Sequence, residues 1–378
     1  MGTEIRLDVA GVSVTYSKNH RGPDHGSIYQ ESDRKAVRSD QIDYDWCSEY
    51  GEDPTSSEMA FERPLKQVVP RLELLGFNLE RVRREYDTVA QIWIEERTSD
   101  DAENDRPVLD LMSFEEFKDF ATGNPLETLN DTPVLDVDSV GDKLIRGRFD
   151  GMSFERIPYN RSGHPNAYSE RSFFGELICI LHPYAVLRLL AAAEANEDAP
   201  VVWQYGPLVD AGWAGDQEFV PNARRTETFL VATEGSSDAH ILKHALELLR
   251  PEIADFFRFI DMTQSHPFSG TGDLVMFAEG LVKIDVQNQV VFLFDNDAEG
   301  LAAHQRLTAL RLPPNMRSVM LPTLDVFRRF PSQGPEGLQH ADINGRAAAL
   351  ECYLDLDINQ HPPATVRWTN YKKKLDTY

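Results

Sequence analysis

The sequence predicts an α/β fold with a parallel sheet in its second half, preceded by a mixed α+β N-terminal domain. Short apolar runs alternate with amphipathic helical segments from residue 227 to residue 322, which is typical of parallel strands joined by crossover helices. The run VVFLFD at 290–295 is apolar almost throughout, as expected of a strand that is covered on both faces. Before residue 227, strand and helix signals are mixed.

The elements of the N-terminal domain, residues 1–225, can be taken in order. Residues 4–17 alternate polar and apolar side chains around Gly11 and predict a β-hairpin. Residues 18–58 predict loops with at most a short helix. Helical periodicity follows at 61–86, with Pro70 as a kink or boundary. Two further helices are expected, at 112–121 after the capping residue Ser113 and at 170–197, where Pro183 divides the segment.

The second half is expected to hold a domain at 226–330 and a C-terminal extension at 331–378. A polar, turn-rich passage at 214–226 marks its beginning. The turn SGTGD at 269–273 serves equally well as a phosphate cradle at a helix start or as a plain turn. The predicted strands are 227–233, 256–262, 290–295 and 317–322, and the predicted helices are 238–249 (after an N-cap at Ser236 or Ser237), 274–283 and 299–310.

Composition limits the class of protein. The 378 residues carry a net charge of −24, so a protein that coats nucleic acid by bulk attraction is excluded. The 3 cysteines are far apart, which excludes a zinc ribbon and a disulfide framework and suits a reducing compartment. Neither a signal peptide nor a transmembrane segment is recognisable. We therefore expect a cytoplasmic protein.

Acidic residues follow two of the predicted strands. Glu234 comes directly after the first strand, Asp295 ends the third, and Asp297 lies two residues further on. Ligands of an open α/β sheet bind outside the carboxyl ends of its strands, so these carboxylates are expected to meet. Because like charges repel, the cluster predicts a hard divalent cation, Mg²⁺ or Mn²⁺. Gly235 and Gly300 are expected to let backbone approach a substrate.

Other interpretations of these motifs exist. Taken alone, each acidic motif is more often a turn or a helix start than a metal site. Their joint occurrence, in order, at the ends of two parallel strands favours the metal site. Asp238 suits both the first helical turn and an outer ligand position. His240 and His244 lack the pattern of a zinc-binding helix and are interpreted as partly exposed helix residues.

The segments LVATEGSSDAHIL (230–242) and VVFLFDNDAEG (290–300) resemble the paired motifs of the TOPRIM domain, a Rossmann-like unit, over roughly 226–330. The opening EIRLDVAGVSVTYSKN and the segment ADINGRAAALECYLDL (341–356) resemble the HEPN/TOPRIM-associated N-terminal family, whose members are often linked to antiphage defence. This second resemblance spans nearly the whole chain.

The resemblance implies roles for individual residues. Glu234 would act as general acid/base or metal ligand, and Asp295 and Asp297 would bind Mg²⁺. Asp238, Asp342 and Glu351 are candidates for a second metal position, although the last two are equally explained as a cap and a solvated helix residue. Lys373 is the catalytic lysine candidate, although Lys372 and Lys374 fit equally well. The candidates for contacts with a nucleic-acid backbone are Arg328, Arg329, Lys372 and Lys374.

TOPRIM proteins perform phosphoryl transfer, which rests on positioning and charge stabilisation. The chain has no room for the strand-gating module of a topoisomerase, and its cysteines and charge do not suit a primase. The sequence therefore predicts a metal-dependent nuclease acting on DNA or RNA as a defence or toxin effector. One alternative is a regulatory protein with a silent TOPRIM domain, whose N-terminal half binds a protein partner; nucleotidyl transfer is another. A homo-oligomer is compatible with all three.

Overall fold

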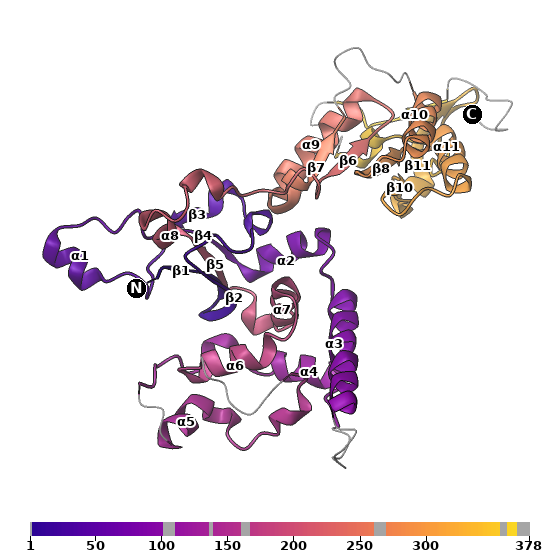
Figure 1. Ribbon diagram of the computed structural model, residues 1–378. Coiled ribbons are helices and arrows are strands. Elements are labelled where there is room, and N and C mark those ends of the chain that lie inside the picture. Colours follow the sequence, from indigo (N-terminus) through magenta and orange to yellow (C-terminus); the bar gives the residue numbers. More distant parts are fainter. Residues whose placement is uncertain are drawn as a thin grey trace. The chain divides into compact units, whose positions relative to one another are not determined.

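The computed structural model describes residues 2–100, 110–135, 139–159, 167–260, 270–355 and 361–368. The chain divides into two compact units, an N-terminal unit (Met1–Ala223) and a C-terminal unit (Arg224–Tyr378) (Figure 1). The C-terminal unit takes in both of the predicted segments 226–330 and 331–378. The division of the chain into three domains stays a prediction.

The N-terminal unit is built on an antiparallel five-stranded sheet of order β2-β1-β5-β4-β3. The predicted hairpin at 4–17 is confirmed. Its turn places Ala10 (φ 45°) and Gly11 (φ 82°) in the left-handed region, as the two-residue turns that match strand twist require. The strands are β1 (Glu4–Val9), β2 (Val12–Lys18), β3 (Arg34–Ala36), β4 (Met59–Pro64) and β5 (Pro200–Gln204).

The helix predicted at 61–86 is wrong at its start. Residues 61–64 belong to β4, which pairs with β5 in the register Phe61↔Trp203, and this long-range pairing overrides the local helical pattern. Pro70 lies inside α2 (Leu65–Leu74), and the break comes instead near Gly76, whose φ is 86°. The strands β3 and β5 were not predicted either. The helix α3 (Leu79–Asp100) follows.

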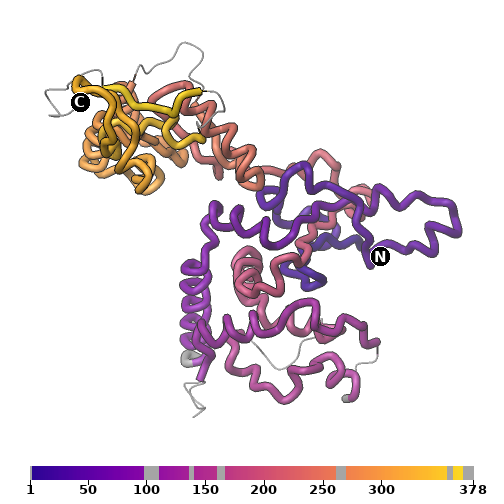
Figure 2. Tube along the Cα trace, turned by 180° about the vertical axis from the view of Figure 1, so that it is seen from behind, coloured from indigo at the N-terminus to yellow at the C-terminus, as the bar shows by residue number. Residues whose placement is uncertain are grey.

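Two predicted helix boundaries are confirmed. Ser113 caps α4 (Phe114–Thr122) by accepting a hydrogen bond from the Glu116 N–H. Pro183 is the first residue of α7 (Pro183–Leu190), and α6 (Glu170–Ile178) meets α7 at a bend of 114°. The helix α3 packs on both α7 and α4 (Figure 2). The remaining helices of this unit are α1 (Tyr44–Tyr50), α5 (Ser139–Arg146) and α8 (Gly206–Asp210).

Among the described residues, no single helix has the length and apolar content needed to cross a bilayer. The bent pair of α6 and α7 meets these criteria by length and composition only. Most of its apolar side chains are buried in the core of the N-terminal unit, which is typical of core helices.

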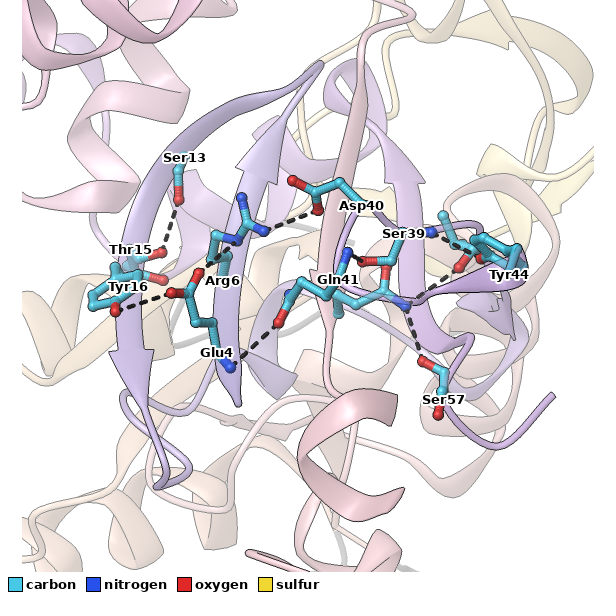
Figure 3. Close-up of polar contacts among 12 residues, drawn as sticks. Glu4, Arg6, Ser13, Thr15, Tyr16, Ser39, Asp40, Gln41, Tyr44 and Ser57 are labelled. Atoms are coloured by element: carbon cyan, nitrogen blue, oxygen red, sulfur yellow. Dashed lines mark hydrogen bonds and ion pairs between the residues drawn. The ribbon is translucent and has the colours of Figure 1, made fainter. Parts of the chain in front are cut away.

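Polar side chains occupy the outer face of β1 and β2 (Figure 3). The Arg6 guanidinium donates to Asp40 over 2.9 Å, and the Tyr16 hydroxyl donates to Glu4 over 3.2 Å. The Gln41 side chain accepts a hydrogen bond from the Glu4 N–H over 3.2 Å. The contacts of Asp40 and Gln41 hold the segment before α1 against β1, while Tyr16 on β2 stays 57% exposed.

A histidine is buried in the core of the same unit. His25 is 3% exposed, and its ring nitrogens lie 3.1 Å from Thr15 Oγ1 and 3.2 Å from the Tyr184 hydroxyl oxygen. Burial lowers the pKa of His25 to about 4, because the charged ring would lose its hydration.

This histidine predicts a loss of stability in acid. Between about pH 6.5 and 4 the unfolded chain binds a proton at His25 and the folded chain does not, so the free energy of unfolding falls by about 2–3 kcal/mol. The variant His25→Gln should lose this part of the pH dependence. Urea unfolding of both proteins at about pH 7 and about pH 4.5 measures how far the free energy of unfolding falls in acid. An equal fall in the wild type and in His25→Gln would contradict the prediction.

The C-terminal unit contains a four-stranded parallel sheet of order β10-β8-β6-β7. This confirms the predicted α/β fold with a parallel sheet. The chain runs from β6 to β7 on one side and then crosses to β8 on the other, so the strand order reverses between β6 and β8 (Figure 1). The strands are β6 (Phe229–Ala232), β7 (Phe257–Phe259), β8 (Gln289–Phe294) and β10 (Met316–Met320).

The helices of this unit start earlier than predicted. Gly235, not Ser236 or Ser237, is the N-cap of α9, because the Asp238 carboxylate turns back to the Gly235 N–H. Of the turn predicted at 269–273, the described residues 270–273 form the start of α10, with Gly270 as N-cap, and residue 269 lies outside the described residues. The helices are α9 (Ser236–Leu249), α10 (Thr271–Lys283) and α11 (Ala298–Ala309).

The segment after β10 returns to the sheet edge. The two-residue strand β9 (Asn296–Asp297) comes shortly after β8 and pairs antiparallel with β13 (Ala347–Ala348). The short helix η10 (Leu350–Tyr353) begins one residue after β13, with Ala349 as its N-cap. This pairing brings residues 342–353 to the carboxyl end of β8. A second small sheet has the order β12-β11-β14, from β11 (Phe330–Gly334), β12 (Gly337–Ala341) and β14 (Val366–Arg367).

Candidate functional site

The candidate site lies at the carboxyl ends of the neighbouring strands β6 and β8. Glu234 follows β6 and Asp295 follows β8, and the two strands pair in parallel register. In open α/β sheets, ligands bind at the point where the strand order reverses, because the loops on its two sides leave in opposite directions. The site therefore occupies the position where open α/β sheets bind ligands.

The Glu234 carboxylate is fixed by two hydrogen bonds. Its Oε2 atom accepts from the Thr271 hydroxyl over 2.6 Å, and its Oε1 atom accepts from the Asp295 N–H over 3.2 Å. The glutamate of the first motif thus contacts the backbone of the second. Sequence reasoning missed the role of Thr271; its place at the start of a helix that follows a strand of this sheet was the available signal.

Three aspartates around Glu234 each have one oxygen held by the backbone. Asp295 accepts from the Leu350 N–H (3.1 Å), Asp238 from the Gly235 N–H (2.9 Å) and Asp297 from the Gly300 N–H (2.7 Å). Such bonds orient a carboxylate before a ligand arrives. The acids are therefore placed by the fold itself.

Burial and mutual repulsion perturb these acids. Burial raises the pKa of Asp295 to about 7, helped by the charges of Asp238, Glu234 and Asp297. Burial also raises the pKa of Glu234, with smaller contributions from Asp297 and Asp238. The pKa of Asp238 is raised by burial and by the charge of Glu351. The cluster thus favours a proton or a cation that reduces its negative charge.

The polar atoms of this cluster are carboxylate oxygens, the type of ligand that hard divalent cations prefer. Among the residues that the structure describes, no three His, Cys, Asp or Glu side chains are close enough together to hold a metal ion. Mg²⁺, however, is usually held by one or two carboxylates, waters and substrate phosphates. One or two of the carboxylates of Glu234, Asp295, Asp297 and Asp238 would be enough for that mode.

The structure separates the two candidates for a second metal position. The exposed Glu351 lies near enough to Asp238 to raise its pKa. Asp342 is exposed and accepts hydrogen bonds from Asn344 N–H (3.0 Å) and the Asn344 side chain, and no described contact joins it to Glu234, Asp238 or Asp295. Asp342 thus has the role of a turn residue here.

Asn296, which lies between Asp295 and Asp297, has a role that sequence reasoning missed. Asn296 is 3% exposed, and its side chain accepts from the Gly345 N–H (2.9 Å) and donates to Asn344 (3.3 Å) and to the Tyr353 hydroxyl (3.2 Å). These contacts fasten residues 344–353 to the turn after β8. The sequence around Asn296 could not predict this role, because its three hydrogen-bond partners lie far along the chain.

One expectation about glycine is corrected. A Cβ atom on Gly300 would lie 2.2 Å from the Asp295 carbonyl oxygen and 3.1 Å from Glu234 Oε1. The space beside Gly300 is therefore filled by the turn after β8 and is not available for a substrate.

The predicted basic residues are only partly described. Arg328 and Arg329 end the short helix η9 (Asp325–Arg329) and are exposed, and Arg328 pairs with Asp325 over 3.2 Å. Lys372, Lys373 and Lys374 lie outside the described residues. His240 and His244 are exposed on α9, as expected of helix residues without a ligand role.

A family model described as HEPN/Toprim N-terminal domain 1 matches residues 1–227, more than half of the chain. The chain belongs to the HEPN/Toprim N-terminal domain 1 family. The predicted resemblance to this family is thereby confirmed, and it indicates a nuclease-related protein. The match covers the N-terminal unit, so the acidic site lies beyond the residues that define membership of the HEPN/Toprim N-terminal domain 1 family. No curated protein and no solved structure matches the chain.

Proposed function

We propose that this protein is a metal-dependent nuclease that hydrolyses phosphodiester bonds of DNA or RNA with Mg²⁺ or Mn²⁺. One observation supports this most directly: Glu234 accepts a hydrogen bond from the Asp295 N–H, although the residues are 61 positions apart. The two acidic motifs therefore meet at the reversal of strand order, where substrates of such sheets bind.

Each residue of the cluster has a defined part in this proposal. A bound divalent cation would neutralise phosphate charge and lower the pKa of an attacking water. Asp295 and Asp297 would hold it, and Glu234, fixed by Thr271, would hold it or move a proton. Because the pKa of Asp295 is about 7, cation and proton compete for this carboxylate. Lys373 as catalytic lysine, and Arg328, Arg329, Lys372 and Lys374 as backbone contacts, stay predictions.

A defence or toxin role in the cytoplasm is part of the same proposal. Its support is the family membership of residues 1–227 together with the resemblance of the two acidic motifs to TOPRIM nucleases. A homo-oligomer is compatible with it.

A regulatory protein that binds a protein partner is the second candidate, and a feature of α1 favours it. None of the residues of α1 is buried, and Trp46 and Tyr50 are 49% and 63% exposed. Exposed aromatic pairs are common anchors of protein interfaces.

Cleavage assays separate the candidates. The full chain is incubated with end-labelled DNA and RNA and with Mg²⁺, Mn²⁺ or a chelator, while calorimetry measures metal binding. Metal-dependent shortening of either substrate supports the nuclease. No cleavage together with no metal binding would overturn it in favour of the regulatory protein, and incorporation of labelled nucleotide would indicate nucleotidyl transfer.

A further inference from the structure

The helix α1 presents two aromatic side chains to solvent. It lies in the connection between the paired strands β3 and β4 and projects away from the sheet of the N-terminal unit (Figure 1). At its start the Asp43 carboxylate accepts a hydrogen bond from the Trp46 N–H over 2.9 Å, and at its end Gly51 takes the left-handed conformation (φ 68°). These caps define the helix locally, although none of its residues is buried.

Trp46 and Tyr50 are four residues apart and therefore lie on one face of α1. Their ring centroids are 5.3 Å apart, and the two residues are 49% and 63% exposed. Tryptophan and tyrosine are enriched at protein interfaces and among the residues that contribute most to binding. The face that carries Trp46 and Tyr50, called the α1 surface below, thus has the composition of a docking site.

The surroundings of the α1 surface are acidic. No Lys or Arg occurs between residues 39 and 62. Asp45 and Glu49 directly precede the two aromatic residues in the chain, are exposed, and have no ion-pair partner in the part of the chain that the structure describes. Further exposed acidic residues of the segment are Asp43, Glu52 and Asp53. A second copy of this surface or a nucleic-acid backbone would meet like charge, so the surface is complementary to a positively charged partner.

The combination of aromatic rings and carboxylates favours arginine over lysine. A guanidinium stacks on aromatic rings and binds a carboxylate through two parallel hydrogen bonds, whereas an ammonium group is a compact, strongly hydrated charge. One such contact already exists at the start of α1, where the Arg38 guanidinium lies 4.4 Å from the centre of the Tyr44 ring. We propose that the α1 surface binds an arginine-rich segment of a partner protein.

This inference names the chemistry of the partner that the second candidate function requires. It does not depend on the acidic site, because α1 belongs to the N-terminal unit. Cleavage and metal binding therefore test the nuclease, and peptide binding tests the α1 surface.

The test uses the full chain and two short fluorescent peptides, one of alternating Arg and Gly and one with Lys in place of Arg. Fluorescence anisotropy at about 0.15 M ionic strength measures binding. We expect the wild type to bind the arginine peptide at least about fivefold more tightly than the lysine peptide. Trp46→Ala and Tyr50→Ala should each weaken binding of the arginine peptide by about 3–10-fold, and Glu49→Gln by about 2–3-fold.

Two matched controls lie elsewhere on the same unit. Trp213 is 54% exposed and Glu194 is exposed, so Trp213→Ala and Glu194→Gln make the same chemical changes away from α1. Both should keep the wild-type affinity within about twofold. Because alanine is the best helix former, a weaker affinity of Trp46→Ala or Tyr50→Ala would reflect the lost ring and not a lost helix.

The other outcomes overturn the proposal. If the two peptides bind equally and the alanine variants keep the wild-type affinity, bulk charge explains the attraction and the α1 surface is refuted. If neither peptide binds, it is refuted as well. If sedimentation shows a dimer that Trp46→Ala dissociates, the occupant is a second copy of the chain. In each of these cases the nuclease stands or falls on its own assays.

Discussion

Replacing Asp295 by asparagine or Glu234 by glutamine is expected to reduce metal-dependent cleavage by about 10²–10⁴-fold. Each substitution removes a charge but keeps an oxygen in place. The amide oxygen introduced by Asp295→Asn can still accept from the Leu350 N–H. The one introduced by Glu234→Gln can still accept from the Asp295 N–H, and its NH₂ group can donate to the Thr271 hydroxyl oxygen. The loss would therefore reflect the missing carboxylate and not a lost fold. Initial cleavage rates at saturating metal measure it, and thermal unfolding verifies that each variant is folded.

Asp342→Asn is the matched control for these variants. It makes the same chemical change at an exposed carboxylate whose hydrogen-bond partner is Asn344, so we expect a rate within about twofold of wild type. Wild-type activity in Asp295→Asn would contradict the proposed function. A loss in Asp342→Asn as large as that in Asp295→Asn would instead show that the segment after β12 supplies a ligand.

Gly300→Ala is expected to lower the free energy of unfolding of the C-terminal unit by about 1–3 kcal/mol and to abolish cleavage. The new methyl group would lie 2.2 Å from the Asp295 carbonyl oxygen. Since that oxygen belongs to the backbone, the turn after β8 must move. The movement would also disturb the bond between Glu234 and the Asp295 N–H. Urea unfolding and cleavage rates of the full chain measure the two effects.

Gly280→Ala provides the opposite expectation in a neighbouring helix. Gly280 lies in α10, and among the described residues, its own helix backbone aside, no atom lies within 4 Å of a Cβ added there. Because alanine is the better helix former, this change should raise the free energy of unfolding by about 0.5–1 kcal/mol and leave cleavage unchanged. Equal free energies of unfolding for Gly280→Ala and Gly300→Ala would contradict the close contact between Gly300 and the Asp295 carbonyl oxygen.

The parts of the fold that the sequence predicts correctly are those with strong local signals. Gly11 defines the first hairpin, Pro183 divides α6 from α7, and the apolar run at 290–295 defines β8. The strands β3 and β5 were missed, and residues 61–64 were assigned to a helix, because their state depends on pairing between β4 and β5. That pairing joins segments more than a hundred residues apart, and no local pattern encodes it.

In the candidate site, too, local signals were predicted from the sequence and long-range contacts were not. The meeting of Glu234 and Asp295 followed from two strands that end at one edge of a parallel sheet. The donors that hold them, Thr271 and the Leu350 N–H, depend on how α10 and residues 342–353 fold back. The different surroundings of Asp342 and Glu351 depend on the same segment, so sequence reasoning left both as equal candidates.

The fastening of Asn296 to residues 344–353 affects how far the protein can be shortened. A stop codon or protease cut after residue 330 would spare the whole parallel sheet, yet it would remove the Leu350 N–H from Asp295 and the partners Asn344, Gly345 and Tyr353 from Asn296. Such a fragment would retain every acidic residue of the two motifs but would lose the hydrogen-bond partners that orient them. The smallest fragment that keeps these hydrogen bonds must therefore extend past Tyr353.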